Sequence, residues 1–233
     1  MWQDIWLSFG KAFDLIGEGN QLLAEIVATT MEMAIKSSLL AFIIGVPVGI
    51  LLASSTFHGK KIFVTILRTC MGLPPVAVGI LVYMLFSGTG PFGSLGLIYS
   101  VNLMVIAQVI LITPIVAGMV ETALTPISMN IKPTIKGLRI NKGKEMFLTI
   151  NEGKYQLIAV FLFAFARSTA EVGAVQIVGG NILHKTRIMT TAIALNYNTG
   201  SFQMALALAI ILILIALGVN VVATLLQMSM KKR

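Results

Sequence analysis

The sequence predicts an all-α membrane protein with about five transmembrane helices, and three observations lead to this prediction. Hydrophobic residues make up 57% of the 233 residues and charged residues only 11%, whereas soluble domains average about 45–50% and about 25%. Apolar stretches recur at the length of roughly 20 residues that a membrane-spanning helix needs. Basic residues gather in alternate connections between these stretches. The length allows five spans with their loops but no additional soluble domain of ordinary size.

Residues 1–25 precede the first apolar stretch, and we expect them to form an external segment at the membrane interface. They lack the basic region followed by an apolar core that marks a cleavable signal peptide. Their apolar residues follow a broken pattern, and Trp2 and Trp6 are of the type that lies among lipid headgroups.

Five predicted spans form a transmembrane domain over residues 26–228. They cover residues 26–53, 62–86, 101–120, 155–178 and 204–228. In the first span, Gly45 and Gly49 have the spacing that permits close contact between helices. In the second span, Pro74 and Pro75 remove two backbone donors, so this helix must bend or break. It is the one span for which the sequence clearly predicts a break.

The basic residues of the connections predict the orientation of the chain. The loop after the first span, the segment after the third span and the tail at residues 229–233 together carry eleven Lys or Arg residues, against three on the other side. This asymmetry places the N-terminus outside and the C-terminus inside, with a basic cytoplasmic tail. The same rule accounts for the net charge of +8 without a nucleic-acid partner.

A long cytoplasmic segment, residues 121–154, separates the third and fourth spans. It is too long for a simple connection, and Pro126 and Pro133 mark its start. We expect one or two short amphipathic helices held off the membrane. Two interpretations remain open, namely a docking element for a cytoplasmic partner and a basic loop that lies on anionic lipid.

Charged residues also occur inside the predicted spans. Arg167 and Glu171 lie four residues apart on one face of the fourth span. A lone charge at the centre of a membrane helix costs about 2.5–3.5 kcal/mol on insertion scales, so the two side chains are expected to pair. The pair has either a functional role or a structural one. Arg68 lies near the start of the second span and can extend its charge to the membrane surface.

The outer connection, residues 179–203, is rich in hydroxyl and amide side chains and has two cations. Backbone amides and helix N-termini in such a segment can hold oxyanions. The alternative is an ordinary polar loop.

Enzymatic chemistry has little support in the sequence. There is no Ser-His-Asp arrangement, and Cys70 is the single cysteine. His58 and His184 lie far apart without a cluster of acidic residues, so we expect no metal site. The glycines and lysines of residues 137–145 depart from a nucleotide-binding loop in spacing and lack its hydroxyl residue. We therefore expect no cofactor in this chain.

Five segments carry a resemblance to a known family. They are Gly72–Gly79 (GLPPVAVG), Gly90–Gly93 (GPFG), Phe165–Gly173 (FARSTAEVG), Val178–Ile182 (VGGNI) and Thr186–Ile193 (TRIMTTAI). These segments resemble the permease subunit of tungstate-type ABC importers, within the larger molybdate and sulfate permease group. The resemblance extends from about residue 18 to residue 228, and the last two segments are its most specific part.

The resemblance implies the MetI-like ABC importer permease fold in a bacterial or archaeal cytoplasmic membrane. It also implies a homodimer around a central pathway, a cytoplasmic pair of ATPase subunits that bind ATP and Mg²⁺, and an external tungstate- or molybdate-binding protein. This chain would then move an oxyanion and perform no chemistry on it.

Residues 121–154 fall where such permeases carry the loop that couples them to the ATPase. The Leu-Gly-Ala element of that loop is replaced here by Leu138-Arg139-Ile140. The residues expected to serve in coupling are Pro133, Gly137, Leu138, Arg139 and Glu152. The residues expected to line or gate the pathway are Pro74, Pro75, Arg167, Glu171, Asn181, Thr186, Arg187, Thr190 and Thr191.

Three other functions were weighed against this one. A molybdate or sulfate importer is a variant of the same class. A stand-alone secondary carrier is disfavoured because five spans do not divide into equal halves and one broken span is predicted, whereas such carriers often have broken helices in both halves. A membrane enzyme is disfavoured by the missing catalytic groups.

Overall fold

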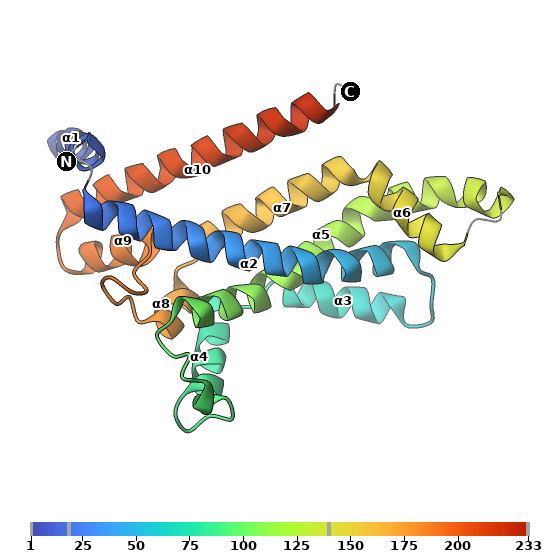
Figure 1. Ribbon diagram of the computed structural model, residues 1–233, viewed down its shortest axis with the longest axis horizontal. Coiled ribbons are helices and arrows are strands. Elements are labelled where there is room, and N and C mark those ends of the chain that lie inside the picture. The colour runs from blue at the N-terminus through green and yellow to red at the C-terminus, as the bar shows by residue number, and fades with distance from the viewer. Residues whose placement is uncertain (1, 18–19, 139–140, 232–233) are drawn as a thin grey trace.

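The computed structural model describes residues 2–17, 20–138 and 141–231. All regular structure in these residues is helical, which confirms the all-α part of the prediction (Figure 1). The elements are α1 (Trp2–Gly17), α2 (Gln21–Ser54), α3 (Lys60–Cys70), α4 (Pro75–Phe86), η1 (Gly93–Leu95), α5 (Val101–Gly137), α6 (Lys142–Glu152), α7 (Lys154–Thr169), α8 (Gly173–Gly179), α9 (Met189–Asn198) and α10 (Phe202–Lys231).

Three of these helices are long and apolar enough to cross a membrane, namely α2, α5 and α10. Two further candidates are bent pairs of helices. The α3–α4 pair is bent by 92° and the α7–α8 pair by 57°. The described residues therefore supply three candidate spans, or five if each bent pair counts as one span.

The core of the bundle is the contact between α2 and α5, which lie side by side (Figure 1). Gly45 packs against Val116 and Gly49 against Val120. A Cβ atom at Gly49 would lie 2.6 Å from the Val120 side chain, closer than real atoms approach. The predicted role of the two glycines in close helix contact is confirmed.

The helix of the predicted third span, residues 101–120, continues to Gly137 as α5. It passes through Pro114, Pro126 and Pro133 without a break. At 1.5 Å per residue its 37 residues span about 55 Å, well beyond a hydrocarbon core of about 30 Å. Each proline removes one hydrogen bond, and neighbouring helices hold the remainder together. Pro126 and Pro133 therefore lie within a helix, and the predicted segment 121–154 starts inside α5 rather than with a short helix of its own.

The expectation of a single broken span was also wrong, because α7 ends at Thr169 and α8 begins at Gly173. No proline lies between them. Instead, the Glu171 carboxylate accepts hydrogen bonds from the backbone N–H groups of Gly173 and Ala174. This acceptor stabilises a new helix start, so a side chain replaces the backbone partner that a continuous helix would supply.

The outer connection, residues 179–203, is no ordinary polar loop. It contains α9, whose Met189 and Ala192 join a second apolar cluster with residues of α2 and α10. This cluster turns much of the connection inward and buries several of its hydroxyl residues.

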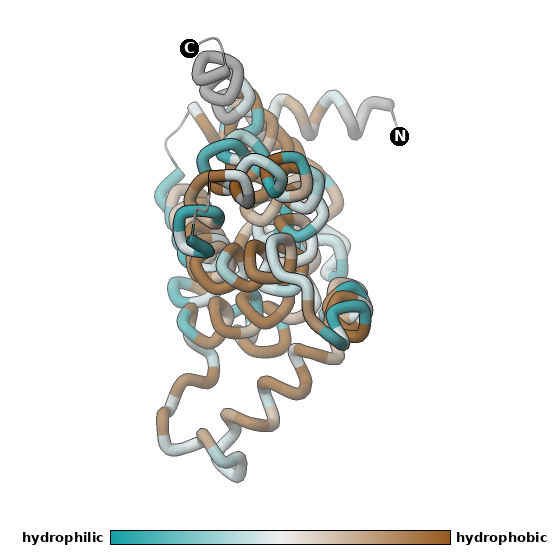
Figure 2. Tube along the Cα trace, turned by 90° about the vertical axis from the view of Figure 1, so that its right-hand side faces the viewer, coloured by the Kyte–Doolittle hydropathy of each residue, from teal (hydrophilic) through white to brown (hydrophobic). Residues whose placement is uncertain are grey.

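The α4 arm, residues 75–100, leaves the bundle nearly at a right angle to α3 (Figure 1). Figure 2 views the molecule from the end at which α6 lies, and hydrophilic segments gather at that end while the projecting arm is coloured mostly hydrophobic to neutral. The exposed apolar side chains of α4 are Val76, Ile80, Leu81, Met84 and Leu85. Each of them is at least 42% exposed, although the Val76 side chain also lies against Gly173 of α8.

Helix α1 exposes Trp6, Phe9 and Phe13 and contacts α10. An apolar face of this kind suits the membrane interface, and the position of residues 1–25 outside the cell stays a prediction.

Candidate functional site: the crossing of two broken helices

The two broken helices meet at their breaks, where α4 packs against α8. Gly79 of α4 lies against the backbone of Ala174, and a Cβ atom there would come within 2.8 Å of the Ala174 Cα. A Cβ atom at Gly173 of α8 would likewise come within 2.8 Å of the Val76 side chain. The small residues thus let two helix starts approach each other more closely than larger side chains would allow.

Pro74 and Pro75, two of the predicted pathway residues, produce the first break. Pro74 has an extended backbone just before α4, and Pro75 is the first helical residue. A proline at that position costs little because its missing N–H would have no partner within the helix. The predicted break at residues 72–75 is confirmed, and the 92° bend turns α4 out of the bundle.

Glu171 and Arg167 form the predicted ion pair at the second break. The Arg167 Nη1 atom lies 2.7 Å from the Glu171 Oε2 atom. The other carboxylate oxygen accepts the N–H of Gly173 at 3.0 Å and that of Ala174 at 3.4 Å. Glu171 is only 4% exposed. Its buried charge is therefore balanced by one cation and by the N-terminus of α8.

Polar side chains from two other helices donate to backbone carbonyls at this break. The Gln108 amide of α5 donates to the Ser168 carbonyl at 3.3 Å, and Thr190 of α9 donates to the Glu171 carbonyl at 2.9 Å. The hydroxyls of Ser37 and Ser168 lie 2.7 Å apart. Irregular backbone at membrane depth requires such partners. Gln108 and Ser37 were missed, although an amide inside an otherwise apolar span was a usable signal.

The remaining outer candidates lie together in the turn between α8 and α9. Arg187 donates to the side chain and to the backbone carbonyl of Asn181, at 3.2 and 3.3 Å. Thr186 is fully buried and joins the Gly179 carbonyl to the Ile182 N–H. The Thr191 hydroxyl caps α9.

These bonds fix the shape of the turn. Of this group, Arg187 also lines a cavity of about 290 Å³ between α2, α9 and α10.

The coupling candidates lie at the opposite end of the bundle (Figure 1). Gly137 ends α5, Pro133 lies inside it and Glu152 ends α6. Leu138 is 67% exposed. Arg139 lies outside the described residues.

One further residue at this end was missed. Phe147 of α6 is 68% exposed, so a second large apolar side chain is accessible at this end of the bundle. A large apolar side chain in a basic segment was the available signal.

Within the described ranges no group of three or more His, Cys, Asp or Glu side chains is placed to hold a metal ion. His184 does have an acidic neighbour that the sequence did not indicate, since its Nδ1 atom lies 2.7 Å from the Glu25 Oε2 atom.

Comparison with known proteins places this arrangement in a family. Residues 45–232 match the family described as "Binding-protein-dependent transport system inner membrane component". The matched region includes both broken helices, the outer turn and α6.

Individual relatives are similar over most of their length. The "Tungstate uptake system permease protein TupB" of Peptoclostridium acidaminophilum is 32% identical over 94% of this chain and 96% of the relative. The protein of the same name from Campylobacter jejuni is 34% identical over 85% of this chain and 83% of the relative. The "Molybdenum transport system permease protein ModB" of Escherichia coli K12 is 27% identical over 69% and 76%. The chain therefore belongs to the binding-protein-dependent inner membrane components, as a multi-pass, non-catalytic permease subunit of an ABC transporter in the cytoplasmic membrane.

Proposed function

We propose that this chain is the pathway subunit of an ATP-driven tungstate importer. The two tungstate uptake permeases are similar to it at 32% and 34% identity over most of both chains. The molybdenum permease is similar at 27% over a smaller share. These comparisons support an oxyanion as the cargo, and the ranking favours tungstate over molybdate or sulfate.

The single observation that carries the mechanism is the crossing of the two broken helices. A continuous helix bends only gradually, whereas a break allows one half to move while the other stays packed. Here the two breaks lie against each other at Gly79 and Gly173. The Glu171 carboxylate bonds Arg167 on one side of the second break and the Gly173 N–H on the other, and so links its two halves. The crossing has the components of a gate with two packings, and Pro74, Pro75, Arg167 and Thr190 belong to it.

The partners in this proposal are a second copy of the chain, a cytoplasmic ATPase dimer and an external tungstate- or molybdate-binding protein. The N-terminus lies outside and the tail at residues 229–233 lies inside. The exposed apolar side chains of the α4 arm support contact with the second copy, since an apolar helix surface outside the bundle is otherwise left without a protein neighbour. The ATPase binds ATP and Mg²⁺, and this chain needs neither.

Coupling in this proposal runs through the end of α5 and through α6. Leu138 and Phe147 present an apolar surface there, at the end of a helix whose start contributes Gln108 to the crossing. ATP binding closes the ATPase dimer and moves these elements, and the ATPase thereby biases the balance between an inward-open and an outward-open packing.

The alternative of a stand-alone carrier has to be judged again, because the structure has two broken helices rather than one. The number of broken helices therefore no longer argues against a carrier. The family match replaces it, since the family is one of binding-protein-dependent transport.

Elemental uptake tests the proposed cargo. Cells with and without this gene, together with its neighbouring partner genes, receive equal nanomolar tungstate and molybdate, and intracellular tungsten and molybdenum are counted by mass spectrometry. We expect accumulation of tungsten over molybdenum that depends on the gene. Equal accumulation, or molybdenum alone, would keep the importer class and reject tungstate specificity, whereas no change in either element would reject both tungstate and molybdate as the cargo.

A further inference from the structure

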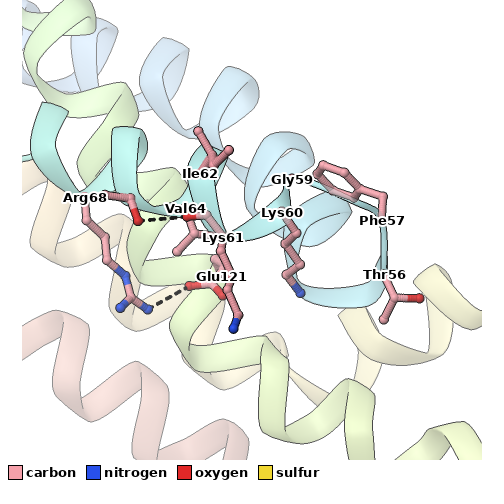
Figure 3. A pocket seen from close by; sticks show the side chains of 10 residues that line it. Thr56, Phe57, Gly59, Lys60, Lys61, Ile62, Val64, Arg68 and Glu121 are labelled. Atoms are coloured by element: carbon pink, nitrogen blue, oxygen red, sulfur yellow. Dashed lines mark hydrogen bonds and ion pairs between the residues drawn. The ribbon is translucent and has the colours of Figure 1, made fainter.

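A second charged site lies outside the crossing, between the α2–α3 connection and α5. A cavity of about 880 Å³ is bordered there by Lys60, Lys61, Thr65, Arg68 and Glu121. Figure 3 shows the three basic side chains pointing to the same side of α3, the side on which Glu121 of α5 lies. Ligand sites typically occupy about 300–1,000 Å³, so the volume suits a small bound group.

The sequence spacing explains why these polar side chains lie on the same side of α3. Lys61, Thr65 and Arg68 are separated by four and three residues, which places them on one face of α3. The apolar side chains Ile62 and Phe63 are exposed on the same helix. The basic side chains of α3 border the cavity together with Ile62, so its lining is partly cationic and partly apolar.

The charges in this cavity do not balance. Its three cations face one carboxylate, which is Glu121, and the Arg68 Nη2 atom lies 3.3 Å from the Glu121 Oε2 atom. Lys60 donates to the Ser55 carbonyl at 3.2 Å. Across the described ranges, neither Lys60 nor Lys61 has a carboxylate within ion-pair distance. Arg68 is occupied by Glu121, and the two ammonium groups are left to attract an anion.

The form of the donors indicates which anion fits. Ammonium and guanidinium groups that border one cavity can donate to several oxygens of a single tetrahedral centre. The connection that carries Lys60 and Lys61 is also on the predicted cytoplasmic side, where basic sites between membrane helices meet phosphate headgroups.

We propose that this cavity binds a tetrahedral oxyanion through Lys60, Lys61 and Arg68, with Glu121 orienting the arginine. The oxyanion is either the phosphate of an anionic lipid or the transported ion on its way to the cytoplasm. Only the second source rests on the proposed function. The site itself follows from the unbalanced charges of the cavity.

The test measures binding rather than transport. The full chain is reconstituted in nanodiscs of phosphatidylcholine, and binding of tungstate and of inorganic phosphate is measured by equilibrium dialysis with elemental counting. In a second arm, part of the lipid is phosphatidylglycerol, and the phosphatidylglycerol retained on the protein is counted by native mass spectrometry. The variants are Lys61→Gln and, as the matched control, Lys185→Gln, which removes an exposed lysine of the outer turn.

We expect Lys61→Gln to weaken binding about fivefold, from the loss of one charge at contact distance in a wet site, and Lys185→Gln to leave it unchanged. Lys61 is exposed, so its replacement does not disturb packing. Glu121→Gln should have the opposite sign and tighten binding, because it removes the negative charge from the cavity. The double variant Arg68→Gln/Glu121→Gln avoids an unpaired buried carboxylate and should weaken binding.

The two arms separate the sources. Loss of tungstate and phosphate binding in Lys61→Gln assigns the site to a free oxyanion, and loss of phosphatidylglycerol alone assigns it to lipid. If neither ligand responds to Lys61→Gln, or if Lys185→Gln has the same effect, the site is rejected. A chain that imports tungsten while its binding ignores Lys61 would overturn this inference and leave the proposed function intact.

Discussion

Single residues at the crossing perform more than one task, and Glu171 is the clearest case. Its carboxylate balances Arg167 and starts α8, and its backbone carbonyl accepts a hydrogen bond from the Thr190 hydroxyl. A group with three partners is difficult to replace, since removing one side of a buried pair leaves the other side uncompensated. The geometry of the second break therefore depends on this single residue, Glu171.

The variant Glu171→Gln removes the negative charge of this side chain but keeps an oxygen that can cap α8. The amide oxygen still accepts the Gly173 N–H, but Arg167 loses its counter-ion. We expect weaker uptake of tungstate with normal membrane assembly. Uptake is measured in cells, and assembly by size-exclusion chromatography of the purified complex.

The matched control is Glu32→Gln, which breaks the Glu32–Lys36 pair of the same spacing on α2. That pair is about half exposed, and exposed pairs contribute about 0–1 kcal/mol, so uptake should not change. Normal uptake by Glu171→Gln would make the Arg167–Glu171 pair dispensable.

At the scale of elements, the contact between α4 and α8 depends on the absence of side chains. The Gly79 position touches backbone rather than a flexible side chain, so a neighbour cannot rotate away. The break between α7 and α8 also exposes backbone carbonyls, and helices α5 and α9 supply donors to them. The crossing is therefore a product of four elements, and none of them forms it alone.

Replacing Gly79 with alanine tests this contact. The added methyl group would lie 2.8 Å from the Ala174 Cα, and such overpacking typically costs about 1–3 kcal/mol. We expect a lower melting temperature and reduced uptake for Gly79→Ala, with melting followed by tryptophan fluorescence in detergent.

Gly218→Ala is the control, because a methyl group at that position of α10 meets nothing within 4 Å. Alanine is also the better helix former by about 1 kcal/mol, so the melting temperature should stay or rise. Equal effects of both variants would show that the α4–α8 contact is not tight.

At the scale of the whole molecule, α5 connects the two regions of interest. Its first half contributes Gln108 to the crossing and its last residue, Gly137, precedes the exposed Leu138. A packed helix of about 55 Å transmits displacement of one end to the other more directly than a loop would. The unexpected length of α5 gives the proposed coupling a rigid path.

Leu138→Glu is expected to uncouple ATP hydrolysis from transport. A charge on the exposed apolar surface would weaken contact with the ATPase and leave membrane insertion unaffected. The assay compares ATP hydrolysis and tungstate uptake by the complete transporter in proteoliposomes. The control Leu138→Met keeps an apolar side chain and should retain both activities, whereas unchanged uptake by Leu138→Glu would count against a docking role.

Much of the fold could be predicted because composition and local chemistry determine it. Apolar length predicts helices in a membrane, and the Gly45–Gly49 spacing and the Pro74–Pro75 pair act on their own backbone. The ion pair of Arg167 and Glu171 also follows from a spacing of four residues. These features depend on neighbours in the sequence, so they can be read without the fold.

The errors have one cause, which is that the deciding partner lies far away in the sequence. Pro126 and Pro133 do not end α5 because other helices support it. Thr186 and Thr191 belong to a polar segment and are nevertheless buried, since α9 packs against α2 and α10. The Arg68–Glu121 pair joins residues 53 positions apart, so no pattern among neighbouring residues predicts it.

The sequence by itself determined the membrane setting, the helical class and the resemblance to oxyanion permeases, because these depend on composition and on short motifs. Only the tertiary structure decided that two breaks face each other, that Glu171 starts a helix, and that three cations and one carboxylate border the same cavity between α3 and α5. The physical reason is that packing and charge act through space. Helices distant in the chain provide hydrogen-bond and ion-pair partners for each other's backbone and charged groups. These partners come within reach only when the chain has folded.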